Sequence, residues 1–456
     1  MTNSTMKTSS IKTSTIKTST IKPSTIKSWG NYPSAETEQF FARYIVDVRK
    51  HILSNDELIA RGQARSYGDS SHANTTLNTT HLNQYINFDQ HSGLLTCFAG
   101  TTLENILNTF VPKGWTLIIT PGTKYVTVAG AIASDVHGKN HHIQGCFSQC
   151  IQQITLMLAN GELIECSPVK NTELFQATCS GMGLTGVIIS ATIKLQKTKT
   201  SYFSQDTIKA KNIEQALKIF EQKQDSDYHV AWIDCLATGD QLGRSIVMCA
   251  KTANKQQLKL HKSAKLNVPM FMPNLTMNRF SIAAFNALYF NKAKDNQNQI
   301  VHYESFYYPL DGLKNWNRLY GKNGFVQYQF VVPKQNGLEA LTLILEKISN
   351  SKQGSCLTVL KELGPENENY LSFPIKGYTL ALDFKVSPTI WGLLDELDEL
   401  VLKYGGKIYL CKDARMSEQT FKQCYPNWTK LQKVREKFGS LQKFNSNQSN
   451  RLGLHP

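Results

Sequence analysis

TPGTKYVTVAGAIASDVHGKNHH, residues 120–142, is the stretch that decides the fold. It places three glycines and three histidines among small alanine and serine side chains. Glycine and alanine let a backbone approach a ligand closely or adopt a positive φ, and successive free N–H groups in such a turn bind anions. Taken alone, the stretch is explained equally well by a glycine-rich loop over the start of a buried helix.

A second loop of the same character lies upstream at Arg61–Asp69, which reads RGQARSYGD. It follows a short apolar run, and strand-like residues 115–119 lead in the same way into the first loop. Two such loops favour a ligand site over a purely structural explanation. A Rossmann-type dinucleotide fold is excluded, because residues 181–186 lead into a buried strand and no strand–GxGxxG–helix unit occurs.

The composition limits the class of protein. The 456 residues carry a net charge of +15, with 50 Lys+Arg against 35 Asp+Glu, which favours an anionic partner. Five of the lysines lie in residues 1–28, a low-complexity STIK repeat that we expect to be disordered. The remaining charge forms no dense basic run, and we expect no nucleic-acid partner. Ten cysteines without a CxxC pair predict neither a zinc site nor a disulfide framework, which favours a reducing compartment.

The pattern of elements changes near Thr200. Before it, strands alternate with short helices, including helices expected at 38–50 and 103–110 and a hairpin around Asn160-Gly161. After it, the chain predicts a large antiparallel sheet with helices on one face. The strands are expected at 228–236, 245–250, 302–309, 325–332 and 378–384, and the helices at 213–222, 338–349 and from Ser387-Pro388 to Gly405-Gly406. Residues 265–300 are expected to form a mobile or ligand-gated loop. No apolar run is long enough for a transmembrane helix, and the N-terminus does not read as a secretory signal.

Several motifs in combination resemble those of a known superfamily. RGQARSYGD, PGTKYVTVAGAIASDVHGKNHH, GLTG, YPLD, QYQFVVP and CKDAR are similar to motifs of the FAD-linked oxidases of the vanillyl-alcohol-oxidase superfamily. Within it, the chain resembles the decaprenylphosphoryl-β-D-ribose 2-oxidase family from about Trp29 to Leu454. The resemblance implies an α+β fold, a two-subdomain PCMH-type FAD-binding domain with an inserted antiparallel-sheet substrate (cap) domain. The implied organisation is a tail at 1–28, an FAD-binding domain at 29–200, a substrate-binding domain at 201–405 and a segment at 406–456 that returns to the FAD-binding domain.

The resemblance also implies the residues that bind FAD. They are Arg61, Gly62, Ala64, Arg65, Ser66, Tyr67, Gly68, Gly122, Thr123, Thr127, Gly130, His137, Gly138, Asn140, Ile188 and Tyr409. Relatives that tether FAD covalently carry a histidine where this chain has Arg65, so we expect noncovalent FAD and no metal. Ala64 and Ala129 stand where the family usually has glycine, and Ala381 replaces a pocket cysteine of the mycobacterial enzymes.

The expected substrate-binding residues are Lys139, Trp232, Tyr308, Gln327, Gln329, Lys361 and Lys412, and the expected catalytic residues are Lys412, His137 and Tyr409. Oxidising a secondary alcohol requires a hydride acceptor, which no common side chain supplies. Lys412, placed by Asp413 and Tyr409, is expected to stabilise the reacting oxygen or relay its proton.

Each assignment has a structural alternative. Lys412 could instead pair with Asp413 or Glu362, and His137 could be a hydrogen-bonded scaffold residue. Gln327 and Gln329 alternate on one strand and so face the same side, either a sugar site or a polar surface. Lys139 and Lys361 either meet a substrate phosphate or are solvated surface lysines.

The resemblance implies oxidation of the 2-hydroxyl of a polyprenylphosphoryl-β-D-ribose to the 2-keto form, the first half of epimerisation to the arabinose lipid. The alternatives are a D-arabinono-1,4-lactone or alditol oxidase acting on a soluble sugar, and a flavin-carrying non-catalytic scaffold. The expected partners are the lipid-linked sugar phosphate and a short-chain NAD(P)H-dependent reductase. We expect a cytoplasmic protein with peripheral contact at the inner membrane.

Overall fold

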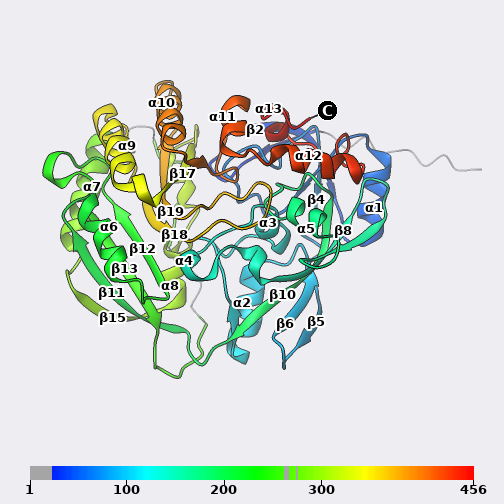
Figure 1. Cartoon of the computed structure of the whole chain (residues 1–456), viewed down its shortest axis with the longest axis horizontal. Coiled ribbons are helices and arrows are strands. Elements are labelled where there is room, and N and C mark those ends of the chain that lie inside the picture. The colour runs from blue at the N-terminus through cyan, green and yellow to red at the C-terminus, as the bar shows by residue number, and fades with distance from the viewer. Residues whose placement is uncertain (1–22, 261–265, 274–275, 456) are drawn as a thin grey trace, which may run out of the picture.

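A computed structural model describes residues 23–260, 266–273 and 276–455. Their architecture is mixed α/β with several sheets, as the sequence predicts at that level (Figure 1). Two smaller sheets lie on the right of Figure 1, and an eight-stranded sheet with its helices lies on the left.

The first small sheet has the order β1-β2-β4-β3. Its strands are β1 Ser24–Lys27, β2 Ser34–Phe41, β3 Ile59–Arg61 and β4 Thr75–Asn78. Helix α1, Ile45–Ser54, follows β2 and buries Val48 and Ile52. Strand β4 runs parallel to both β2 and β3. The loop at residues 62–74 therefore leaves the end of β3 and crosses back to the start of β4 at the opposite end of the pair.

The second small sheet is built around β10, Val187–Lys197, an eleven-residue strand. Its first three side chains are buried, and the following ones alternate between half-buried and buried. The other strands are β5 Tyr85–Asp89, β6 Leu94–Phe98, β7 Trp115–Leu117, β8 Ile151–Met157 and β9 Leu163–Cys166. The helices of this region are α2 Leu103–Phe110, α3 Val128–Ala133, α4 His141–Gln144 and α5 Thr172–Thr178. The hairpin at Asn160-Gly161 is confirmed, since β8 and β9 pair antiparallel across it.

The eight-stranded sheet has the order β15-β11-β13-β12-β18-β19-β17-β20 and is antiparallel throughout. Its strands are β11 Tyr202–Ala210, β12 Tyr228–Ile233, β13 Ser245–Thr252, β15 Gln297–His302, β17 Phe325–Pro333, β18 Thr358–Leu363, β19 Gly377–Lys385 and β20 Lys407–Ile408. Helices α6 Ile213–Gln222, α9 Gly337–Ser351 and α10 Ile390–Lys403 pack against one another beside it (Figure 1). The expected antiparallel sheet with neighbouring helices is confirmed.

The C-terminal segment contacts the N-terminal half. It contains α11 Glu418–Cys424, α12 Trp428–Lys437 and α13 Asn447–Arg451. Arg435, buried on α12, donates to the Leu184 carbonyl, and the Asn447 N–H donates to the His72 carbonyl. These contacts hold α12 and α13 against the region that carries the two glycine-rich loops.

Four predicted elements are wrong. The strand expected at 302–309 is instead helix α8, Tyr303–Tyr307, because the His302 side chain accepts from the Glu304 N–H and caps a helical turn there. The helix at 38–50 is instead strand β2 followed by α1, because residues 38–41 pair with Thr75–Asn78 and tertiary pairing overrides local preference. The tail at 1–28 is not irregular at its end, since Ser24–Lys27 pair with β2; its residues 1–22 lie outside the described part of the chain. Within 265–300, the described residues form β14 Leu266–Asn267 and the 14-residue helix α7, Arg279–Lys292, in place of a loop.

Candidate active site

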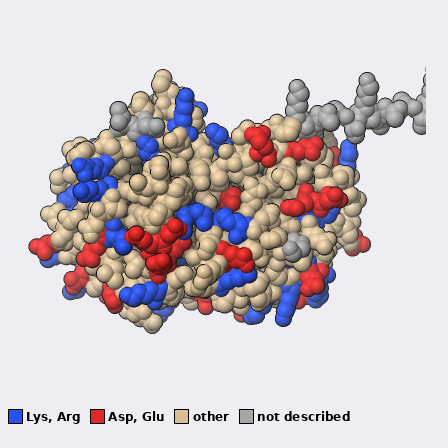
Figure 2. All heavy atoms as spheres, turned by 90° about the horizontal axis from the view of Figure 1, so that it is seen from above, with Lys and Arg blue, Asp and Glu red and all other residues tan. Residues whose placement is uncertain are grey.

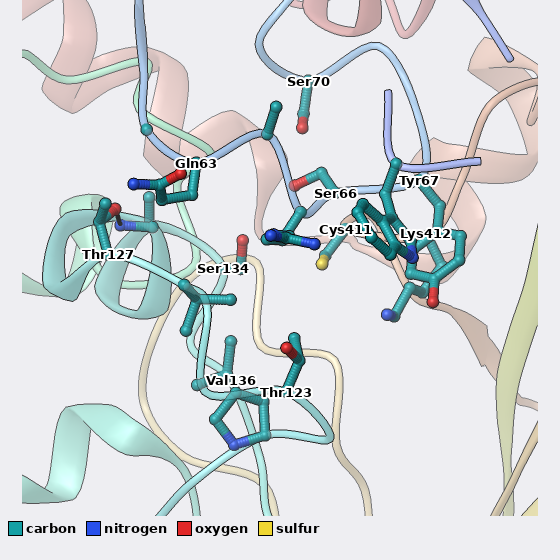
Figure 3. Close-up of a pocket in the computed structure, with 18 of the residues that line it drawn as sticks. Gln63, Ser66, Tyr67, Ser70, Thr123, Thr127, Ser134, Val136, Cys411 and Lys412 are labelled. Carbon is teal, nitrogen blue, oxygen red and sulfur yellow. Dashed lines mark hydrogen bonds between the residues drawn. The ribbon is translucent and has the colours of Figure 1, made fainter. Parts of the chain in front are cut away.

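A long cavity lies between the two glycine-rich loops and the end of the eight-stranded sheet (Figure 3). One wall is the loop that follows β3, and the second is the stretch from Pro121 to His137 that contains α3. The third wall consists of side chains from β17, β18 and β19 and the turn Tyr409–Lys412 after β20. Both loops singled out in the sequence thus line one cavity.

Buried contacts from the C-terminal segment hold the loop after β3. The Tyr67 N–H donates to the Cys411 carbonyl, 3.1 Å between N and O. A β-carbon on Gly68 would lie 1.6 Å from the Asp413 carbonyl oxygen, so only glycine fits there. Asp69 accepts from Arg451 at 2.7 Å, and Arg451 also binds Asp413 at 3.0 Å. The loop and the turn at residues 409–413 therefore form one packed unit.

Ala64 sits in this loop with φ 52°, in the left-handed region that glycine adopts without strain. Because alanine stands where the family usually has glycine, the backbone of the cavity wall is strained at this residue by about 1 kcal/mol. Ala129, the other departure, lines the opposite wall.

Arg61 and Arg65 bracket the start of the loop but have different surroundings. The Arg61 guanidinium turns away from the cavity and donates to the Lys27 carbonyl at 2.7 Å and to Ser71 Oγ at 2.9 Å. Arg65 lines the cavity, with its guanidinium carbon 4.1 Å from the centre of the Trp29 ring. Its buried Nε has no hydrogen-bond partner among the described residues.

His137, Tyr409 and Phe373 form an aromatic group at the base of the cavity. The Phe373 and Tyr409 rings stack with centroids 4.5 Å apart, and His137 stacks on Phe373 at 5.6 Å. Gln329 donates through Nε2 to His137 Nε2 at 3.1 Å, and the Tyr409 hydroxyl donates to the Ser134 carbonyl at 2.8 Å. Burial lowers the pKa of His137 well below its usual range, and the nearby Lys361, His141 and Lys412 lower it further. His137 is therefore neutral at physiological pH and available for hydrogen bonding.

Two half-buried lysines, Lys361 on β18 and Lys412 after β20, line the same end of the cavity. Neither side-chain ammonium makes a hydrogen bond or an ion pair with any residue in the described ranges, and Lys412 Nζ lies 4.1 Å from the centre of the Tyr67 ring (Figure 3). Burial and the charge of Lys412 lower the pKa of Lys361 to about 8. Burial also lowers the pKa of Lys412.

The expected ion-pair partners of Lys412 are engaged elsewhere. Asp413 binds Arg451, and Glu362 binds Lys334 at 2.7 Å. The expectation that Asp413 places Lys412 is therefore wrong, although the Lys412 N–H does donate to the Tyr409 carbonyl at 2.9 Å. The acid that acts on Lys412 is Asp383, which sequence reasoning missed. Burial raises the pKa of Asp383 to about 7, while a Gln327 hydrogen bond of 2.5 Å and the Lys412 charge oppose the rise.

The structure brings together most of the predicted site residues. Those that line the cavity are Gly62, Ala64, Arg65, Ser66, Tyr67, Gly122, Thr123, Thr127, Gly130, His137, Ile188, Gln327, Gln329, Lys361, Tyr409 and Lys412. Both glutamines of β17 face the cavity, and the intervening Tyr328 is buried on the other side, where it donates to Asp398 at 3.0 Å. The two amides therefore face the cavity and do not form an exposed polar face.

Other predicted residues lie behind the wall. Lys139 donates to the Phe306 carbonyl, Tyr308 bonds Thr120, and Trp232 donates to the Cys356 carbonyl at 3.1 Å. Asn140 donates to the Ile118 carbonyl at 2.8 Å. Arg61, Gly68 and Gly138 are likewise outside the lining. These side chains support the cavity wall in the state that the structure describes.

Sequence reasoning missed several lining residues. Among them are Trp29, Gln63, Ser70, Asp311, Trp316, Val359 and Cys411. Asp311 belongs to the YPLD motif and accepts from Thr123 Oγ1 at 2.9 Å and from the Lys124 N–H at 3.0 Å. The YPLD motif marks Asp311 in the sequence, but only the tertiary structure shows that this residue bonds the glycine-rich stretch at residues 123–124.

The cavity suits a long, thin ligand with an anionic centre. Small residues line both long walls, and a β-carbon on Gly62 would lie 2.6 Å from Thr127 Oγ1, so the walls approach closely without side chains between them. The unpartnered Arg65 Nε provides a buried cationic donor. These features fit the pyrophosphate and ring system of FAD. No group of His, Cys, Asp or Glu suited to a metal ion occurs in the described part of the chain.

Comparison with known proteins agrees with this fit. Residues 36–167 match the family model of an FAD binding domain, so the protein is an FAD-dependent oxidoreductase. The chain belongs to the family of FAD-linked oxidases that contains decaprenylphosphoryl-beta-D-ribose oxidase. It is 34% identical to the decaprenylphosphoryl-beta-D-ribose oxidase of Mycolicibacterium smegmatis over 411 residues, 87% of this chain and 89% of that protein.

More distant relatives match over shorter regions. A D-arabinono-1,4-lactone oxidase of Yarrowia lipolytica is 32% identical over 152 residues, 32% of this chain and 29% of that protein. An L-gulonolactone oxidase of Scyliorhinus torazame is 29% identical over 175 residues, 37% of this chain and 39% of that protein. The lactone oxidases therefore resemble a part of the chain.

Proposed function

We propose that the enzyme oxidises the 2-hydroxyl of a polyprenylphosphoryl-β-D-ribose to the 2-keto form. The observation that carries this proposal is the pair Lys361 and Lys412, which face the cavity without ion-pair partners in the described ranges, beside the amides of Gln327 and Gln329. Two unpaired cations suit a phosphate, and two amides on one strand suit sugar hydroxyls. The long match to the ribose-lipid oxidase supports the same substrate class.

In this proposal, FAD when bound would supply the hydride acceptor that oxidation of the sugar carbon requires. The loop after β3 and the wall around α3 hold the cofactor, and Arg65 meets its pyrophosphate. The charged Lys412 donates to the reacting oxygen and relays the hydroxyl proton, giving one of its own protons to Asp383 as it takes up that of the hydroxyl. Asp383, with a pKa near neutrality and an unpartnered Oδ2, passes the proton onward. His137, neutral and bonded to Gln329, positions the sugar.

In this proposal the chain has the domain organisation that the family resemblance implies. Residues 406–456 join the N-terminal half in one FAD-binding unit, and the eight-stranded sheet forms the substrate-binding (cap) domain between them, with boundaries near 200 and 405. FAD is noncovalent, because arginine replaces histidine at the tether position. A short-chain NAD(P)H-dependent reductase uses the ketone product. The protein works on the cytoplasmic side, in peripheral contact with the inner membrane.

The decisive experiment is an absorption spectrum of the purified protein followed by anaerobic substrate addition. A polyprenylphosphoryl ribose analogue should bleach the flavin, and free alditols and lactones should not. Bleaching by soluble lactones alone would instead identify a lactone or alditol oxidase. A bound flavin that no sugar reduces would contradict both enzyme assignments and favour the scaffold alternative. Acid precipitation should release all the FAD into the supernatant.

A further inference from the structure

Helix α7, Arg279–Lys292, buries Ile282 and Asn286 but leaves a second apolar face exposed. Asn286 is fully buried and donates to Asp234 Oδ1 at 2.7 Å. On the opposite face Phe280 is 70% exposed and Leu288 is 71% exposed. These two residues and Ala284 follow an i, i+4, i+8 spacing, so they form one apolar stripe. A surface helix normally buries such a stripe, so this one lacks its partner in the isolated chain.

The preceding segment extends the exposed apolar surface. Leu266 and Met270 are largely exposed, on residues 266–272. Strand β14 in this segment pairs with β16, Leu313–Lys314, and Arg318 donates to the Pro269 carbonyl at 2.8 Å. Arg318 belongs to the short 3-10 helix Trp316–Tyr320 that follows β16, and Trp316 at its start lines the cavity. The exposed apolar surface is thus attached directly to the cavity wall.

The charge of this region has one sign. From Gln241 to Lys294 the sequence contains nine Lys or Arg and no Asp or Glu. Arg279, Lys292 and Lys294 are exposed at the two ends of α7. Elsewhere on the surface seen from above, basic and acidic side chains are interspersed with wide uncharged areas (Figure 2). Arg244 and Lys251 pair with Asp234 and Asp225, and exposed Asp295 follows Lys294, so the cations left at the ends of α7 are Arg279, Lys292 and Lys294. Exposed apolar side chains beside such cations are the pattern of a segment that lies in an anionic membrane interface.

We propose that the stripe Phe280–Ala284–Leu288, with Leu266 and Met270, seats the enzyme on an anionic lipid bilayer and brings the cavity to the membrane surface. The apolar side chains enter the boundary between headgroups and acyl chains, and the lysines and arginine meet lipid phosphates. A second copy of the chain is a poorer occupant, because an isologous contact would bring the same cations together. The proposal deepens the proposed function, since a polyprenyl-linked substrate resides in the bilayer.

The test is flotation of the FAD-loaded protein with vesicles of phosphatidylglycerol and phosphatidylcholine. The wild type should float with the anionic mixture and remain in solution with pure phosphatidylcholine. Phe280→Ser with Leu288→Ser should lower the vesicle-binding constant about tenfold, since two large apolar contacts with the bilayer are lost. Lys292→Glu with Lys294→Glu should lower it at least tenfold. The matched control is Val46→Ser with Leu53→Ser on α1, where the side chains are 64% and 59% exposed; it should bind like the wild type.

Equal loss in the α1 control, or flotation that none of the substitutions changes, would overturn the proposal. Concentration-dependent dimerisation that the α7 substitutions abolish, without any vesicle binding, would identify a second copy as the occupant. Flavin bleaching by a short-chain soluble analogue should be unaffected by the α7 substitutions. A wild type that the analogue bleaches but that does not float with anionic vesicles would overturn this proposal alone, and a protein that floats but that no lipid-linked sugar bleaches would overturn the proposed function alone.

Discussion

Lys361 should make substrate binding depend on pH in the alkaline range. With a pKa of about 8 in the free enzyme, caused by burial and then by the Lys412 charge, about nine-tenths of Lys361 is charged at pH 7 and about one-tenth at pH 9. An anionic ligand stabilises the charged form and raises the pKa, so binding takes up a proton. Affinity is then highest below the free pKa and falls as pH rises through it.

The expected loss of affinity between pH 7 and pH 9 is about tenfold, provided that the contact of charged Lys361 with the phosphate is worth about 1.5–3 kcal/mol. A polyprenylphosphoryl ribose analogue suits the assay, because a phosphodiester does not titrate in this range. Titration calorimetry in two buffers of different protonation enthalpy measures both the affinity and the proton uptake.

Two substitutions isolate the lysine. Lys361→Arg keeps its charge to high pH, so its affinity should stay nearly constant from pH 7 to pH 9. Lys361→Met should bind about tenfold or more weakly at pH 7. A tenfold fall that persists in Lys361→Arg would refute the reasoning, because Lys412 or another group would then be the titrating residue.

Three further predictions concern the turn beside the cavity. Lys412→Met should retain bound FAD but slow its anaerobic reduction by the sugar by about 100-fold or more, as measured by stopped-flow absorbance; an unchanged rate would remove Lys412 from the catalytic step. Gly68→Ala should reduce the FAD content of the purified protein, measured as the ratio of flavin to protein absorbance, because the added β-carbon would collide with the Asp413 carbonyl. The control Gly392→Ala adds a carbon with nothing within 4 Å and should leave that ratio unchanged. Arg451→Met should lower the free energy of unfolding by about 3–5 kcal/mol, because two largely buried carboxylates lose their cation; denaturant titration showing a loss below about 1 kcal/mol would contradict this.

The sequence correctly predicts elements whose stabilising contacts lie within the element itself. The helix expected at 213–222 has those bounds, because an apolar stripe and the Asn212 cap define it within the segment itself. The Asn-Gly hairpin is equally local. The helix expected at 38–50 is wrong because β2 is stabilised by pairing with β4, which lies more than thirty residues further along the chain.

The same difference separates the site residues that sequence motifs predict from those that only the tertiary structure brings together. Motif positions such as Gly62, Gly130 and Lys412 line the cavity as the resemblance implied. The partner of Lys412 could not be read from its neighbours, since Asp413 turns towards Arg451. Trp29 and Trp316 come from distant segments whose rings meet at 6.0 Å, and only the tertiary structure shows that both face the cavity.

The bond between Asp69 and Arg451 joins residues 382 positions apart in the chain. During synthesis, the loop that follows β3 leaves the ribosome long before the arginine that holds its last residue. A nascent chain therefore carries an incomplete flavin site until residue 451 has emerged, and cofactor capture must wait for that residue. A chain that stops before Arg451 should consequently be cleaved by a protease between Gly62 and Asp69 faster than a chain that includes it.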